Sequence, residues 1–264
     1  MKTVMSIAGS DCSGGAGIQA DIKTCIAFGV YCTTAITAVT AQNPYKFVNA
    51  NYVGDDVLKM QLEAILDSST PDAVKIGMLP TVSAIEIVTD TIERYKLTNI
   101  VLDPVISATS ACEKATNSGN HFEEWKEAMM TRLFPLCTLI TPNLPELAVF
   151  IGNEIYNAEQ QGCEFLEKNR YEGSMLVKGG HGEGNICKDI LLSADGTTSY
   201  ESNRIDTKHT HGTGCTLSSA IACNLALGHD LKKAVRIAKE FTRRCILKAA
   251  DADLYSHNGP LIHF

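Results

Sequence analysis

A glycine-containing loop that runs directly into an apolar segment is the part of this chain best suited to chemistry. The loop is His211-Gly212-Thr213-Gly214-Cys215-Thr216, and the apolar segment extends from Leu217 to Leu227. This pattern predicts the N-terminus of a helix, where several free backbone N–H groups and the positive end of the helix dipole form an anion site. The same location lowers the pKa of a thiol, so we expect Cys215 to be reactive.

Two chemistries are open to a thiolate beside an anion site. Cys215 could attack an electrophile, or it could take the proton from a hydroxyl group that then attacks a phosphoryl group. His209 and His211 precede the loop. A histidine that close could depress the thiol pKa further, whereas the simpler interpretation is that both are solvated loop residues.

Polar residues also follow short apolar segments that are typical of buried strands. They include Asp103, Asn143 with Glu146, and Lys178, which precedes two glycines. Phosphoryl transfer needs magnesium, which carboxylates often hold through water, and positive charge near the phosphates. Asp103 and Glu146 are therefore candidate magnesium-site residues, and Lys178 is a candidate phosphate ligand. The alternatives are a structural role for Asp103, helix capping by Glu146 and a surface position for Lys178.

The segment from Gly15 to Ala20 matches the pattern G-x-G-x-x-A of dinucleotide-binding proteins, but its context does not. That fingerprint requires an acidic residue at the end of the second strand to bind the ribose hydroxyls. Here the second strand ends in Thr40-Ala41-Gln42-Asn43. The amide of Gln42 donates and accepts hydrogen bonds, so it suits the edge of a heterocycle better than a ribose. A tight turn and close helix packing are the structural explanation of the glycines.

Strand-like and helix-like segments alternate along the chain, and they predict the scaffold that positions these residues. Buried strands that alternate with amphipathic helices favour a doubly wound, mostly parallel sheet covered on both faces, in one domain over residues 1–264. Ligands bind such sheets beyond the carboxyl ends of the strands. The polar segment from Ile106 to His121 is predicted to be a loop of the kind that forms a lid or is disordered. The predicted strands are 4–8, 34–40, 73–78, 100–105, 138–140, 175–177, 189–193 and 197–201, and the predicted helices are 18–28, 55–66, 82–95, 122–133, 146–151, 158–169, 216–227 and 231–249.

Composition limits the classes of function. Apolar residues make up 45% and charged residues 20%, and the net charge of −7 gives no support for binding to nucleic acid or to an anionic membrane surface. No apolar run approaches the length of about 18 residues that a membrane span needs. We expect a cytoplasmic protein whose ten cysteines are free thiols, because they show neither CxxC pairs nor zinc-ligand spacing.

Taken together, seven stretches resemble the hydroxymethylpyrimidine/phosphomethylpyrimidine kinases of thiamine biosynthesis. They are long, occur in the expected order and span nearly the whole chain. The resemblance implies a ribokinase-like fold, which is a three-layer α/β/α domain with a reduced lid, and usually a homodimer. The stretches are Ala8–Asp21, Val39–Asn43, Lys75–Leu79, Asp103–Val105, Thr141–Glu146, Val177–His181 and Thr210–Thr216.

The resemblance also implies roles and cofactors. The protein would use ATP and Mg²⁺, Cys215 would deprotonate the substrate hydroxymethyl group, and the N–H groups of Gly212, Thr213 and Gly214 would form the anion site. Gln42 would read the aminopyrimidine edge. Asp103 and Glu146 would serve the magnesium–phosphate region and Lys178 the ATP phosphates. The resemblance further implies that substrate is contacted by Gly9, Ala16, Asp21, Met78 and Val105, and nucleotide by Asn143 and Gly214.

Three other functions remain open on the sequence. A pyridoxal or pyridoxine kinase would carry the same Gly-x-Gly-Cys loop and phosphorylate a similar hydroxymethyl heterocycle, and Gln42 favours the pyrimidine. A non-catalytic metabolite-binding protein would not need the loop together with Lys178 and Asp103. A cysteine hydrolase would use Cys215 as its nucleophile.

Overall fold

Nine strands form one sheet in the described part of this computed structural model, which covers residues 1–43, 45–106, 121–181, 184–252 and 258–264. The strands are β1 (Thr3–Asp11), β2 (Tyr31–Asn43), β3 (Lys46–Tyr52), β4 (Ala73–Ile76), β5 (Ile100–Leu102), β6 (Leu139–Ile140), β7 (Ser174–Val177), β8 (Ile186–Ser193) and β9 (Gly196–Asn203). Their order is β3-β2-β1-β4-β5-β6-β7-β8-β9. Strands β2, β1, β4, β5, β6 and β7 run parallel, and the pairs β2–β3, β7–β8 and β8–β9 are antiparallel.

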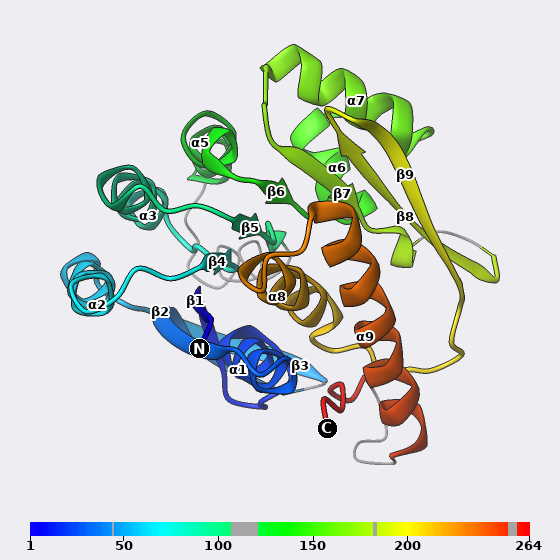
Figure 1. The fold of residues 1–264 in the computed structure, drawn as a ribbon, viewed down its shortest axis with the longest axis horizontal. Helices are drawn as coiled ribbons and strands as arrows, with labels where there is room; N and C mark the ends of the chain where they lie inside the picture. Colours follow the sequence, from blue (N-terminus) through cyan, green and yellow to red (C-terminus); the bar gives the residue numbers. More distant parts are fainter. Residues whose placement is uncertain (44, 107–120, 182–183, 253–257) are drawn as a thin grey trace.

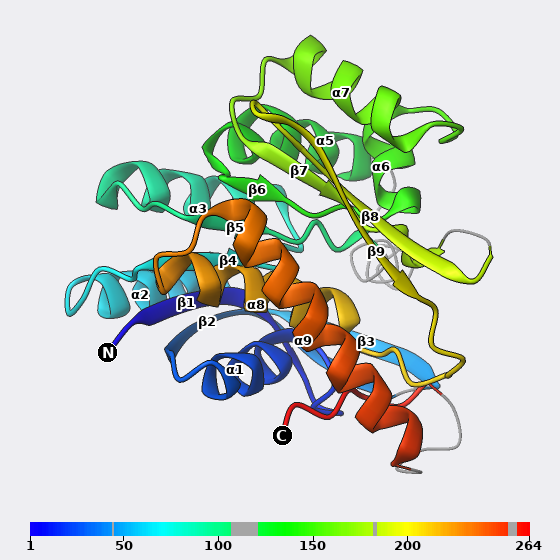
Figure 2. The ribbon, with the colours of Figure 1, turned by 45° about the vertical axis from the view of Figure 1, so that its right-hand side comes forward.

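Helices cover both faces of this sheet, because successive strand residues point to opposite faces and both faces are apolar. On one face, Met5 and Val74 pack against helices α2 (Asp55–Leu66), α3 (Val82–Tyr95), α5 (His121–Ala128), α6 (Leu144–Ile151) and α7 (Ala158–Asn169). On the other, Val4 and Ala73 pack against α1 (Gly17–Ala27), α8 (Thr213–Ala226) and α9 (Leu231–Asp251). Figures 1 and 2 show α1, α8 and α9 together on their side of the sheet. The predicted three-layer α/β/α fold is confirmed.

Helix α8 lies in the centre of its layer. Every residue from Thr216 to Ala226 is buried, because α1, α9 and the sheet pack around the helix. The helix begins at Thr213 rather than at Thr216. The prediction that Cys215 lies in its first turn is therefore confirmed.

Two segments differ from the sequence prediction. Strand β3 was not predicted, because its alternating residues include two asparagines, which are poor strand formers, and much of the strand is exposed. The helix predicted for 122–133 ends as α5 at Ala128 and continues as a π-turn over Met129–Leu133, shortly before Pro135. Of the predicted loop between Ile106 and His121, residues 107–120 lie outside the described residues.

The end of β2 extends beyond its pairing with β1 and forms an antiparallel hairpin with β3. Strand β1 pairs with β2 as far as Thr40, whereas β3 pairs with it from Ala38 to Asn43. This hairpin forms one edge of the sheet. It brings Gln42 and Phe47 to the carboxyl edge of the parallel strands, where ligands are expected.

Candidate active site

The predicted substrate residues meet in one pocket at the carboxyl ends of β1, β2, β4 and β5. The cavity has a volume of about 70 Å³, and Cys215 contributes to its wall. Five residues predicted to contact substrate line it with Cys215: Gly9, Ala16, Gln42, Met78 and Val105. Gly9 lies at an irregularity of β1, and a Cβ there would approach within 3.3 Å of Met78 Sδ, so a side chain would crowd the pocket wall.

The N-terminus of α8 adjoins this pocket. Gly212 caps the helix with a φ of 86°, a left-handed conformation that glycine adopts without strain. The Thr213 N–H donates to the Thr210 carbonyl at 3.2 Å, so this predicted anion-site donor is already engaged. Within the described residues, the N–H groups of Gly214 and Cys215 have no backbone acceptor. The Gly212 N–H also has no backbone acceptor among the described residues, so the available donors are those of Gly212, Gly214 and Cys215.

The environment of Cys215 corrects the expectation of a lowered thiol pKa. Burial raises the pKa of Cys215, the Lys75 ammonium lowers it, and the carboxylates of Asp21 and Asp103 raise it, for a value of about 11. The Gly17 N–H donates to the thiol and also lowers the pKa, but less than burial raises it. Because loss of water outweighs the positive groups, Cys215 is a protonated thiol near neutral pH.

Asp21 does not line the pocket, contrary to the prediction that it contacts substrate. Its carboxylate is buried and accepts hydrogen bonds from Ser6 at 2.6 Å, from Lys75 at 2.9 Å and from Ser219 at 2.6 Å. Position 21 lies one turn into α1, on the face that packs toward α8. Lys75, which sequence reasoning did not single out, lines the pocket instead.

Asp103, Glu146 and Lys178 form a charged cluster beside the start of α8. Lys178 Nζ donates to Asp103 Oδ1 at 2.5 Å and lies 3.8 Å from Glu146 Oε2. A Cβ on Gly214 would lie 3.0 Å from Asp103 Oδ2 and 3.4 Å from Lys178 Nζ, so the cluster touches the helix terminus. Burial raises the pKa of Glu146 to about 7, although Lys178 opposes the shift.

Glu146 also caps α6, which confirms the alternative interpretation of this residue as a helix cap. Asn143 and Glu146 form a reciprocal capping box, with both hydrogen bonds at 2.8 Å. Capping fixes the backbone so that the Glu146 carboxylate stays beside Lys178. The structural and functional interpretations of Glu146 are therefore compatible.

His211 pairs with Asp11 rather than with Cys215. His211 Nε2 lies 2.8 Å from Asp11 Oδ2, and the same carboxylate accepts from the N–H groups of Ser13 and Ala16 at 2.9 and 2.8 Å. Burial raises the pKa of Asp11, but the hydrogen bonds from His211, Ser13 and Ala16 outweigh it and lower the pKa to about 2. This ionised carboxylate joins the glycine turn before α1 to the loop before α8.

Comparison with known proteins decides the family. The family model for phosphomethylpyrimidine kinase matches residues 11–261 of the chain. The chain belongs to the phosphomethylpyrimidine kinase family. It is therefore a phosphotransferase.

Similar proteins include both pyrimidine kinases and vitamin B6 kinases. The hydroxymethylpyrimidine/phosphomethylpyrimidine kinase of Rhizobium meliloti is 37% identical, over 98% of this chain and 96% of the relative. The pyridoxine kinase of Bacillus subtilis is also 37% identical, over 100% and 96%. The pyridoxal kinase of Staphylococcus aureus, solved with AMP-PCP and pyridoxal, superposes with a TM-score of 0.84 at 29% identity, covering 100% of this chain and 94% of that one.

The carboxylates of this family member suit a magnesium ion that arrives with phosphate groups. The described residues hold no cluster of three or more His, Cys, Asp or Glu side chains arranged for a metal ion. Asp103 and Glu146 supply two carboxylates, and Lys178 already places a positive charge between them. Mg²⁺ is commonly bound by one or two carboxylates together with substrate phosphates, so these residues fit it.

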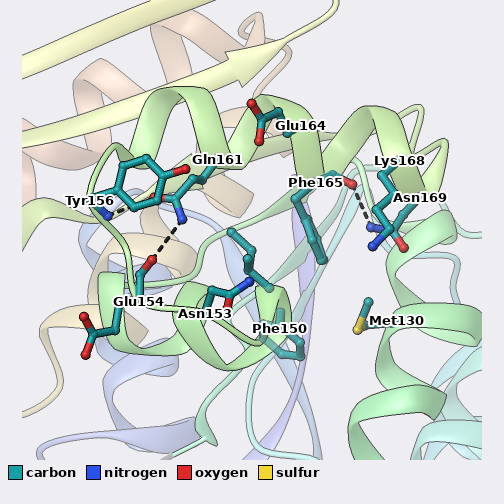
Figure 3. A pocket seen from close by; sticks show the side chains of 11 residues that line it. Met130, Phe150, Asn153, Glu154, Tyr156, Gln161, Glu164, Phe165, Lys168 and Asn169 are labelled. Carbon is teal, nitrogen blue, oxygen red and sulfur yellow. Dashed lines mark hydrogen bonds between the residues drawn. The ribbon is translucent and has the colours of Figure 1, made fainter.

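A larger cavity of about 570 Å³ lies elsewhere in this phosphomethylpyrimidine kinase family member, between the π-turn, α6 and α7. It shares no lining residue with the Cys215 pocket. Polar side chains in it bond to nearby backbone: Gln161 donates to the Glu154 carbonyl at 2.9 Å and Asn169 to the Phe165 carbonyl at 2.7 Å (Figure 3). Cys215, the predicted catalytic residue, lines the smaller pocket.

Some pocket residues were not predicted from the sequence. Lys75 carries the clearest signal, because a lysine within the apolar strand Ala73-Val74-Lys75-Ile76 must be paired or functional if the strand is buried. No feature of the sequence indicated that Phe47 would line the pocket, since β3 itself was not predicted.

Among the described residues no helix has the length and apolar content to cross a membrane.

Proposed function

We propose that this protein transfers the γ-phosphoryl group of ATP to the hydroxyl of 4-amino-5-hydroxymethyl-2-methylpyrimidine, and then phosphorylates that monophosphate to the diphosphate, as a step of thiamine biosynthesis. One observation carries the proposal. Gln42, Met78 and Val105 line the same pocket as Cys215, and the charged cluster of Asp103 and Lys178 adjoins the helix that bears Cys215.

Gln42 supports recognition of an aminopyrimidine. Hydrogen bonds to Cys12 engage only the backbone of Gln42, at 3.1 and 3.4 Å. Among the described residues its carboxamide has no hydrogen-bond partner, so both its donor and its acceptor are available to ligand. An aminopyrimidine offers an N–H donor next to a ring-nitrogen acceptor, which complements one carboxamide.

The mechanism follows from the positions of the groups. Cys215, as the thiolate, would accept the proton of the substrate hydroxyl, and the resulting oxygen nucleophile would attack the γ-phosphorus as ADP leaves. The N–H groups of Gly214 and Cys215 would stabilise negative charge on the transferred group, and Lys178 would bind phosphate oxygens. Asn143 lies beside Lys178 through an isolated bridge and would serve the nucleotide region. Asp103 and Glu146 would hold Mg²⁺, which neutralises phosphate charge when bound.

Pyridoxal kinase is the second candidate, since a pyridoxine kinase is as similar in sequence as the pyrimidine kinase is. A coupled ADP-release assay with Mg-ATP, offering hydroxymethylpyrimidine and pyridoxal side by side, separates the two. Preference for the pyrimidine supports the proposal, and preference for pyridoxal replaces it with vitamin B6 salvage. Turnover of neither, with binding of pyrimidine retained, would favour a non-catalytic binding protein.

The role of Cys215 has its own test. The Cys215→Ala variant should lose turnover by at least about 100-fold while it retains pyrimidine binding, because general base catalysis contributes 10²–10⁴-fold. Cys163→Ala, on the remote helix α7, is the matched control and should keep full activity. Full activity of Cys215→Ala removes the base role, and a covalent adduct on Cys215 during turnover would indicate a nucleophile instead.

We further propose a cytoplasmic homodimer. Val39 on β2 and Val48 on β3 are 52% and 56% exposed, and β3 is an edge strand. Exposed apolar side chains on an edge strand and on the strand beside it favour association with a second copy. Light scattering after size-exclusion chromatography tests it, and a monomer at micromolar concentration contradicts it.

A further inference from the structure

Lys75 is a fully buried lysine at the base of the substrate pocket. Its side chain is 0% exposed, yet it contributes to the pocket wall. Its ammonium group can donate three hydrogen bonds, and among the described residues it donates one, to Asp21 Oδ2 at 2.9 Å. Burying a charge costs desolvation free energy that an ion-pair partner and hydrogen bonds must offset. The groups around the Lys75 ammonium therefore decide why it is buried there.

Asp21 holds this lysine beneath the start of α8. The Asp21 carboxylate accepts one bond from Ser6 on β1 and one from Ser219 on α8, both at 2.6 Å. Ser219 lies four residues after Cys215, which places both side chains on one face of the helix, one turn apart. The ion pair of Lys75 and Asp21 is therefore held against the face of α8 that carries Cys215, one turn further along the helix.

The charges that act on Cys215 come from several elements. Lys75 on β4 and Lys178 after β7 are positive, whereas Asp21 on α1 and Asp103 after β5 are negative. Burial raises the pKa of Cys215 most strongly, and Lys75 is the group that lowers it most. Lys75 itself remains charged, because Asp21 and the negative groups around it raise its pKa despite burial.

We propose that Lys75, held in place by Asp21, is a positioning residue that supplies the fixed positive charge beside the Cys215 thiolate. The inference rests on the proposed role of Cys215 as the base. Three geometric observations support it. Lys75 and Cys215 line the same pocket, the Lys75 ammonium donates to Asp21 alone among the described residues, and Ser219, which also bonds to Asp21, lies one turn after Cys215. A residue that only stabilised the fold would not need to reach the pocket wall.

A thiol-reactivity measurement tests this without requiring turnover. Iodoacetamide reacts with thiolates, and peptide mass spectrometry reports the alkylation rate of Cys215 separately from that of other cysteines. One pKa unit changes the thiolate fraction about tenfold well below the pKa. In Lys75→Met, alkylation of Cys215 at pH 8 should be at least about 10-fold slower than in wild type. In Asp21→Asn, which removes a negative charge and keeps the lysine, it should be faster.

The opposite signs separate this role from a structural one. If the ion pair only held the fold together, both variants would loosen the pocket and change Cys215 reactivity in the same direction, and that result overturns the proposal. The half-buried Cys163 on α7 is the internal reference and should react equally in all variants.

Folding of the variants needs its own control, since breaking a buried pair is destabilising. The double variant Asp21→Asn/Lys75→Met leaves no unpaired charge and should alkylate more slowly than wild type, whereas a rate equal to wild type contradicts the proposal. Failure of the base role would appear separately, as full turnover of Cys215→Ala. If Lys75→Met and wild type alkylate Cys215 at equal rates while Cys215→Ala is inactive, the proposed role of Lys75 is rejected and the base role of Cys215 is retained.

Discussion

Gly212→Ala should abolish most of the activity while leaving the fold intact. Gly212 has a φ of 86°, and a Cβ there would overlap the carbonyl oxygen of Gly15. The left-handed backbone costs about 1–2 kcal/mol with a side chain. The overlap has to be relieved by moving the loop, by on the order of 1 Å, away from the glycine turn, and this shifts the N–H groups of Gly214 and Cys215.

The expected loss follows from that displacement. A misplacement of about 1 Å at a reacting centre costs roughly 10²-fold in rate, which corresponds to about 2.7 kcal/mol of transition-state stabilisation. We therefore expect kcat to fall at least about 100-fold in the ADP-release assay.

Gly228→Ala provides a matched control at the other end of α8. Gly228 has a φ of 88°, but a Cβ there would meet nothing within 4 Å. It should lose only the roughly 1–2 kcal/mol of the strained backbone, measured by thermal unfolding, and retain kcat. If Gly212→Ala keeps kcat within about 3-fold of wild type, the α8 terminus does not stabilise the transferred group. If Gly228→Ala loses activity equally, backbone strain rather than displacement of the loop is responsible.

Three further predictions concern specificity, ionisation and stability. Gln42→Ala should lower kcat/KM for the pyrimidine at least about 10-fold in the ADP-release assay, since a paired buried hydrogen bond is worth roughly 1–3 kcal/mol, and unchanged kinetics would remove Gln42 from recognition. The kcat/KM of the wild type should rise with pH about tenfold per unit between about pH 7 and 10, because a base with a pKa of about 11 must lose its proton first, and a plateau already below pH 8 contradicts that assignment. Asp11→Asn should lose on the order of 2 kcal/mol of stability at pH 7 in urea unfolding. Because the folded pKa of Asp11, about 2, lies below its ordinary value, this contribution is present above about pH 4 and disappears as pH falls through 2, so an equal loss at pH 2 would refute it.

Strongly periodic elements were predictable from the sequence, because a local pattern determines them. Helices α2, α3 and α7 begin and end where their patterns predicted. The pocket residues at strand ends were predictable for a related reason: parallel strands bring their carboxyl ends to one edge. Strand β3 was not predictable from the sequence, since its stability comes from pairing with β2 rather than from its own residues.

Electrostatic environments were the least predictable part of the site. A helix N-terminus indicates a lowered thiol pKa at Cys215, but the degree of burial depends on packing of α8 against elements distant in the chain. The prediction that Asp21 contacts substrate was wrong for the same reason. Its spacing from the glycine turn suggested the pocket, and only the assembled fold directs its carboxylate to Lys75 and Ser219.

The bond between Asp11 and His211 joins residues 200 positions apart. Its consequence concerns the synthesis of the chain, because such a contact cannot form until both of its residues have been synthesised. Strand β1 lies inside the sheet, and the loop that completes the pocket is synthesised 200 residues after Asp11, at the end of that strand. A partly synthesised chain that ends before residue 211 therefore lacks both the partner of Asp11 and Cys215, and the pocket is completed only after synthesis has passed residue 215.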